Sequence, residues 1–204
     1  DLGVQQIVSG GQTMNPSTED ILHAAEQVPA MDVYVLPNNK NIVMAAEQAA
    51  RLARTSGVRR IHVVPTTTIP QGISAMMAYD ESAEIKDNVE AMQEAASRVQ
   101  SGSVTFAARD SDYDGHQIKE GELLAPENGK VAFTGTDLGS VTAKVAKDLM
   151  REDSQFITLL YGADVSEEQA ADVEEAVRSL LPEEVELTVA YGGQPVYYFL
   201  ISVE

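Results

Sequence analysis

The sequence predicts an α/β protein in which a parallel-sheet βα subdomain, residues 1–100, precedes a mixed α+β subdomain, residues 101–204. In the first half, short apolar segments alternate with stretches whose apolar residues recur at helical spacing, which is typical of parallel βα units. In the second half, turn signals separate short strand-like segments, which favours antiparallel pairing. Ser101-Gly102-Ser103 lies between the two patterns and is the expected boundary.

The first half is expected to contain three strand–turn–helix units and one further helix. The expected strands are Val4–Val8, Asp32–Leu36 and Arg60–Val64. The expected helices are Ser17–Gln27, a helix from Ile42 to Ser56 that stops at Gly57, one that begins near Pro70, and Ala83–Val99. Two caps suit the first helix: Asn15 before Pro16, or Ser17 with Asp20 three residues on.

Polar residues gather in the turn that follows each expected strand. They are Gln12, Thr13, Asn15 and Ser17 in the first turn, Asn38, Asn39 and Lys40 in the second, and Thr66, Thr67, Thr68 and Gln71 in the third. Because the carboxyl ends of parallel strands lie at one edge of a sheet, the three turns are expected to converge. They would form a polar ligand pocket or a partner-docking edge, and the same residues also suit plain helix caps.

The second half is expected to be mostly antiparallel, with two helices. A strand at Val104–Arg109 should turn through Asp110–Gly115 and return along His116–Lys119. The remaining expected strands are Lys130–Thr134 after an Asn128-Gly129 turn, Phe156–Gly162, Val185–Val189 and Val196–Val203. Helices are expected after Asp137 and after Ser166, and a glycine turn at Tyr191–Pro195.

The composition limits the classes of function. The chain has 14 basic and 32 acidic residues, a formal net charge of −18, which disfavours nucleic acid and anionic membranes as partners and suits a basic protein surface. With no cysteine, disulfides and thiolate chemistry are excluded. No apolar run approaches the roughly 20 residues of a transmembrane helix, so we expect a cytoplasmic protein without membrane insertion.

Motifs for catalysis or metal binding are weak or missing. The chain contains neither of the glycine-rich phosphate-binding signatures nor a Gly-x-Ser-x-Gly elbow. Asp110–Gly115 begins like a calcium loop, but its twelfth position is Gly121, and a hairpin turn is the simpler interpretation. His62 lies between Ile61 and Val63 and is interpreted as a packed strand histidine. We therefore predict no catalytic residue and no metal site.

Three motifs in order carry a family resemblance: Ser9-Gly10-Gly11-Gln12-Thr13-Met14-Asn15-Pro16-Ser17-Thr18-Glu19-Asp20, Leu36-Pro37-Asn38-Asn39-Lys40-Asn41-Ile42, and Val64-Pro65-Thr66-Thr67-Thr68-Ile69-Pro70-Gln71-Gly72. With the Asp114-Gly115 hairpin and Gly192-Gly193-Gln194-Pro195, the chain resembles the C-terminal region of the A subunit of bacterial fatty acid kinase. That protein is related to dihydroxyacetone kinase (a DAK-domain protein), and the resemblance implies a DegV-like fold. The resemblance covers essentially the whole chain.

The resemblance implies a role within a larger enzyme. The complete kinase polypeptide phosphorylates the carboxylate of a fatty acid held by a DegV-like carrier protein, for phospholipid synthesis. Its C-terminal region is implied to help bind that carrier and to lie beside the rest of its own polypeptide. The kinase motif of the Asp-Gly-Asp-Thr-Gly type does not occur here. ATP and Mg are therefore expected only in the absent kinase domain, and this chain alone is expected not to be an enzyme.

A more distant likeness to the DegV carriers implies the alternative function, binding of a fatty acid or acyl phosphate. Thr13–Ser17 is similar to their head-group loop, and Thr66-Thr67-Thr68 with Gly72 is similar to their second ligand turn. Where those carriers have a histidine-containing stretch, this chain has Tyr191–Pro195, including Gly193 and Gln194, with no histidine. The resemblance leaves open whether the chain forms a homodimer.

Overall fold

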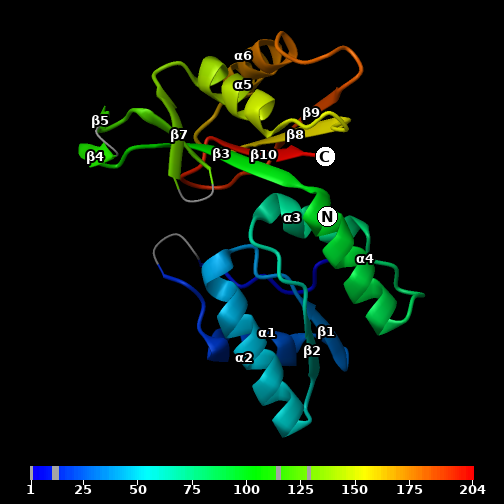
Figure 1. Ribbon diagram of the computed structural model, residues 1–204. Helices are drawn as coiled ribbons and strands as arrows, with labels where there is room; N and C mark the ends of the chain where they lie inside the picture. Colours follow the sequence, from blue (N-terminus) through cyan, green and yellow to red (C-terminus); the bar gives the residue numbers. More distant parts are fainter. Residues whose placement is uncertain (1, 11–13, 114–115, 128–129) are drawn as a thin grey trace. The chain divides into compact units, whose positions relative to one another are not determined.

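The computed structural model describes residues 2–10, 14–113, 116–127 and 130–204. The chain divides into two compact units, Asp1–Val99 and Gln100–Glu204, and we describe each unit by itself. The course of the chain through both units can be followed in Figure 1.

The first unit is built on two parallel strands, β1 (Asp32–Val35) and β2 (Arg60–Val63), paired from Asp32 opposite Arg60 to Val35 opposite Val63. Alternate residues of a strand point to opposite faces. Val33 and Ile61 therefore share one face, where they pack in a buried cluster with α1 (Thr18–Gln27) and α2 (Lys40–Ser56). Asp32, Tyr34, Arg60 and His62 occupy strand positions of the other parity.

Local signals explain the helix boundaries. Ser17 caps α1 in a reciprocal capping box with Asp20, so the second of the two predicted caps is the one that forms. Gly57 ends α2 in the left-handed conformation with φ 71°, as its position after the last apolar residue predicts.

The predicted strand at Val4–Val8 is wrong. The structure gives residues 2–10 no regular secondary structure, and the Ile7 side chain is 84% exposed. The apolar residues of this segment predict a strand, but a strand also needs a neighbouring strand to accept its backbone hydrogen bonds. In the described residues of this unit, the parallel sheet consists of β1 and β2 alone.

Two further helices complete the first unit. Helix α3 (Ile69–Met77) follows β2, and α4 (Ile85–Arg98) runs up to Val99. Val64, Ala75, Met92 and Ala96 form a buried cluster against which Tyr34 and Leu36 pack.

The described residues of the second unit form a six-stranded sheet in the order β7-β6-β3-β10-β8-β9. The strands are β3 (Gln100–Phe106), β6 (Leu123–Glu127), β7 (Lys130–Gly135), β8 (Phe156–Tyr161), β9 (Glu186–Tyr191) and β10 (Phe199–Val203). All pairs are antiparallel except β8 with β9. The predicted, mostly antiparallel second half is thus confirmed.

The predicted pairing of Val104–Arg109 with His116–Lys119 is wrong. Strand β3 begins at Gln100, includes the expected boundary Ser101–Ser103, and pairs with β6 and β10. The short β5 (His116–Ile118) pairs instead with β4 (Ser111–Tyr113), which forms from part of the predicted turn. The Asp114-Gly115 and Asn128-Gly129 turns lie outside the described residues.

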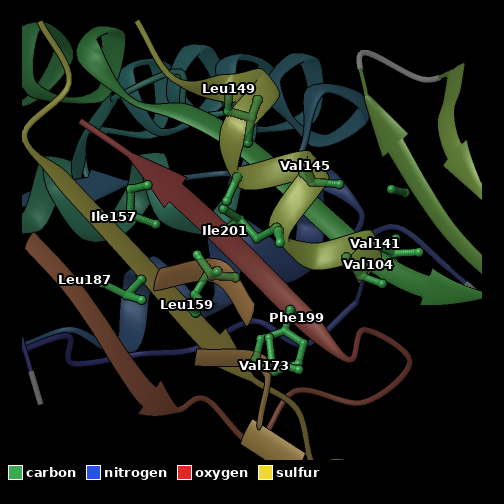
Figure 2. Close-up of a cluster of buried hydrophobic side chains, with 14 of the residues drawn as sticks. Val104, Val141, Val145, Leu149, Ile157, Leu159, Val173, Leu187, Phe199 and Ile201 are labelled. Carbon is green, nitrogen blue, oxygen red and sulfur yellow. The ribbon is translucent and has the colours of Figure 1, made fainter. Parts of the chain in front are cut away.

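Helices α5 (Leu138–Leu149) and α6 (Glu167–Arg178) lie on one face of this sheet (Figure 1). Asp137 caps α5, and Ser166 caps α6 in a capping box with Gln169. The core lies between helices and sheet. Figure 2 shows Val141, Val145 and Leu149 of α5 together with Val104 of β3 and Ile201 of β10.

None of the helices in the described part of the chain has both the length and the apolar character that a bilayer span requires.

Candidate functional site

The second and third polar turns meet through Asn38 and Thr66. The Asn38 backbone N–H donates to Thr66 Oγ1 at 3.2 Å, and Thr66 Oγ1 donates to Asn38 Oδ1 at 2.8 Å. Thr66 is 1% exposed, and Asn38 has a φ of 54°. Asparagine tolerates this left-handed region better than most residues. The predicted convergence of these two turns is therefore confirmed, and we call this pair the Asn38–Thr66 lock.

Gly72 makes the lock possible. A Cβ atom at this position of α3 would lie 2.1 Å from Asn38 Oδ1 and 2.7 Å from its Cγ. No real Cβ atom approaches a neighbour this closely, so only glycine leaves room for the Asn38 side chain.

Other polar groups of these turns bond within their own turn. Gln71 Oε1 accepts from both the backbone N–H (2.8 Å) and the hydroxyl (2.9 Å) of Thr67. Thr68 caps α3 by accepting from the Gln71 N–H at 3.3 Å. Asn39 caps α2 by accepting from the Asn41 N–H at 2.9 Å, and Lys40 is the exposed first residue of that helix.

The first polar turn is described only in part, because Gln12 and Thr13 lie outside the described residues. Asn15 is exposed. Ser17 Oγ accepts from the Asp20 N–H and donates to Asp20 Oδ2, so its polar groups serve the cap of α1. The Ser17 backbone N–H and hydroxyl hold the pKa of Asp20 below its ordinary value. In the described part of the chain, no hydrogen bond joins Asn15 or Ser17 to the other two turns.

The remaining predicted site residues, Gly193 and Gln194, lie in the second unit. Gln194 donates from Nε2 to the Leu160 carbonyl at 2.7 Å and accepts on its own carbonyl from the Ala163 N–H at 3.1 Å. The Gly193 N–H donates to the Tyr161 carbonyl at 3.2 Å. Both residues therefore fix the loop between β9 and β10 to the end of β8.

A second polar cluster in the first unit was not predicted from the sequence. Asp32 Oδ1 lies 2.7 Å from Arg60 Nε and 2.8 Å from His62 Nε2, and Asp32 Oδ2 also accepts from Arg60. The Arg60 guanidinium, and then the His62 ring, hold the pKa of Asp32 well below its usual range. The alternation of Asp32 with Val33 and of Arg60 and His62 with Ile61 is the signal that could have placed all three on one face.

Tyr34 continues this face toward α4. Its ring centroid lies 5.6 Å from that of His62 and 5.4 Å from that of Tyr79. Burial raises the pKa of Tyr34, while a hydrogen bond with Asn88 opposes that effect. Asn88 is 3% exposed and exchanges hydrogen bonds with the Asp80 backbone at 2.6 and 2.9 Å. The cluster thus links the sheet to α4.

The described residues contain no group of three or more His, Asp or Glu side chains that could hold a metal ion. The two joined turns offer neutral amides and hydroxyls, and the hydroxyls and backbone groups named above are already paired with one another. The chemistry available there is therefore hydrogen bonding rather than proton transfer or metal binding.

Solved structures define the class of protein. The fold is that of DegV and dihydroxyacetone kinase proteins, which share it at low sequence identity. The dihydroxyacetone kinase of C. freundii matches with a TM-score of 0.69 and 16% identity over 92% of this chain and 41% of that one. A DegV family protein of Ruminococcus gnavus matches with a TM-score of 0.60 and 13% identity over 93% and 77%.

The chain belongs to the FakA-like C-terminal family, named for the C-terminal region of the A-type fatty acid kinase polypeptide, and the family model matches residues 1–204. Relatives include the uncharacterized protein SH1689 of Staphylococcus haemolyticus, 42% identical, and protein YloV of Bacillus subtilis, 40% identical, each over 203 residues. The matches cover 100% of this chain but 36% of each relative, so the chain spans about a third of their length. The recognised family and the DegV-like fold class are thereby confirmed.

Proposed function

We propose that this chain is a non-catalytic docking domain of a fatty acid kinase. It binds a DegV-like, fatty-acid-binding carrier protein so that a separate kinase domain, which holds ATP and Mg, phosphorylates the acyl carboxylate. The family membership and the chain's span of 36% of its relatives support a role as one part of a longer polypeptide. Such a protein would work in the cytoplasm.

One observation favours docking over ligand binding, namely the Asn38–Thr66 lock. A turn that holds a small polar ligand needs donors and acceptors directed at that ligand. Here the Thr66 hydroxyl and the Asn38 amide oxygen bond each other, and Gln71 takes both donors of Thr67. The edge formed by these two turns therefore offers a preformed surface.

Calorimetric titration of the chain with a purified DegV family protein, loaded with fatty acid, tests this function. We expect saturable binding with one carrier per chain. A protein of similar negative charge but another fold is the control, because charge attraction alone would give the same heat with both. No binding at high micromolar concentration would refute the proposal.

The alternative is a small-ligand domain that holds a fatty acid or acyl phosphate at the Gln12–Ser17 loop. DegV neighbours of this fold are described as fatty acid binding, which favours this second candidate. Native mass spectrometry of the chain with added fatty acid tests it. A mass increase of one fatty acid, lost when Asn15 is changed to Ala, is the supporting result, and an unchanged mass contradicts it.

A further inference from the structure

The loop between β9 and β10 presents an exposed aromatic side chain that is already held in place. Tyr191 is 65% exposed, yet its ring centroid lies 5.3 Å from that of Tyr161. Its ring also lies against Gly193, where an added Cβ would be 3.2 Å from the ring atoms. Exposed tyrosines of this kind are favoured at protein interfaces, because a fixed ring loses little conformational freedom on binding.

The backbone that carries this ring is rigid. The Gly192 and Gly193 N–H groups donate to the Tyr161 carbonyl at 2.9 and 3.2 Å. Further along, the Tyr197 N–H donates to the Pro195 carbonyl at 2.8 Å around Val196, whose φ is 72°. This is a γ-turn of the rarer, strained form, with a β-branched residue at its centre.

Contacts with β3 hold that strain in place. Thr105 Oγ1 donates to the Val196 carbonyl at 2.8 Å, and the Tyr198 N–H donates to the Val104 carbonyl at 2.8 Å. Strain that the surrounding structure maintains is found mainly where a fixed shape serves binding or catalysis. Catalysis is not indicated here, because the loop 191–198 contains no acidic, basic or histidine side chain.

The charge beside Tyr191 is negative. The Ala163 N–H donates to the Gln194 carbonyl at 3.1 Å, which sets the loop after β8 alongside the loop that follows Tyr191. That neighbouring segment continues through Asp164 to Glu167 and Glu168 in the first turn of α6, and all three side chains are exposed. Neither residues 162–168 nor residues 191–198 include a lysine or an arginine.

We propose that Tyr191, with these three carboxylates, is the docking point for a basic surface of the partner protein. An arginine of the partner would stack on the exposed Tyr191 ring, while Asp164, Glu167 and Glu168 attract it. Arginine suits this surface better than lysine because its planar guanidinium both stacks on an aromatic ring and donates to a carboxylate. This inference rests on the proposed docking function and assigns the surface that carries it.

The test is calorimetric titration of the chain and its variants with the DegV family protein at physiological salt. Tyr191→Ala should weaken binding about tenfold, because hot-spot residues of this type carry much of an interface's affinity. Tyr191→Phe keeps the ring and should bind within about twofold of the parent chain. Leu180→Ala is the matched control, since Leu180 is also an exposed apolar residue, 44% exposed, but follows the other end of α6.

Charge is tested separately with Glu167→Gln/Glu168→Gln, which should slow association and reduce its dependence on salt. The control pair Glu174→Gln/Glu175→Gln removes the same charge from the last turns of α6 and should change the salt dependence less. Circular dichroism melts verify that each variant is folded.

The outcomes separate the two proposals. Parent-level binding by Tyr191→Ala, or an equal loss in Leu180→Ala, would overturn the assignment of this surface and leave the docking function standing. No binding by the parent chain itself would overturn the docking function and this inference with it.

Discussion

Replacing Gly72 with Ala tests whether the Asn38–Thr66 lock holds the two turns together. The new Cβ would lie 2.1 Å from Asn38 Oδ1, so the Asn38 side chain has to leave. Its departure leaves the buried Thr66 hydroxyl without its acceptor, which costs about 1–3 kcal/mol. Residual crowding costs roughly 1–3 kcal/mol more. Alanine returns about 1 kcal/mol as a better helix former, so we expect a net loss of about 2–4 kcal/mol.

The assay is urea unfolding followed by circular dichroism, with Asn38→Gly and the double variant Asn38→Gly/Gly72→Ala completing a cycle. Glycine at position 38 accepts the φ of 54° and removes the colliding side chain. The double variant should therefore be more stable than the sum of the single losses predicts, by at least about 1 kcal/mol. A Gly72→Ala chain of parental stability, or additive effects, would refute the reasoning.

Three other predictions concern stability. Asp32→Asn should lower the free energy of unfolding by about 1–2 kcal/mol at pH 7, because it weakens the bonds from Arg60 and His62. Since folding lowers the pKa of Asp32, its contribution is complete above the unfolded-state value near 4 and fades as the pH falls below it. Urea titrations from pH 7 to pH 3 should show the gap to the parent narrowing, and a gap that widens toward acid would contradict this assignment. Thr142→Val should stabilise the chain by about 1 kcal/mol, because the buried Thr142 hydroxyl has no hydrogen-bond partner among the described residues; Thr142→Ser, which keeps the hydroxyl, is the control in the same melts and should show no gain. Val196→Gly should gain roughly 0.5–1.5 kcal/mol by relieving the positive φ, and lower stability would mean that the Val196 side chain contributes more than the strain costs.

Signals that act within a few residues gave correct predictions. Ser17 with Asp20, Ser166 with Gln169, and Gly57 each satisfy or end a helix through backbone groups close in the sequence. For this reason the helices could be placed closely from the sequence alone.

Strand pairing was predicted less well, because partners are chosen by segments far along the chain. Val104–Arg109 has its turn signal immediately after it, yet β3 pairs with β10, almost a hundred residues later. Likewise, Val4–Val8 has the composition of a strand, but no strand of the described residues pairs with it.

The candidate site was predicted in part. The rule that parallel strands end at one edge correctly joins Asn38 to Thr66, but it does not show that their polar groups bond each other. The Asp32 cluster and the Tyr191 ring depend on register and on loop geometry, neither of which a residue pattern contains. Whether the turns bind a ligand or a partner stays a prediction.

The position of β10 sets the order in which the second unit can be assembled during synthesis. Phe199–Val203 is fully buried and lies between β3 and β8. Until these five residues leave the ribosome, β7-β6-β3 and β8-β9 are two separate half-sheets, each with an open edge that could pair with another chain. The nascent domain therefore depends on protection from aggregation until its central strand arrives, and a premature stop before Phe199 would remove the strand that joins the two halves.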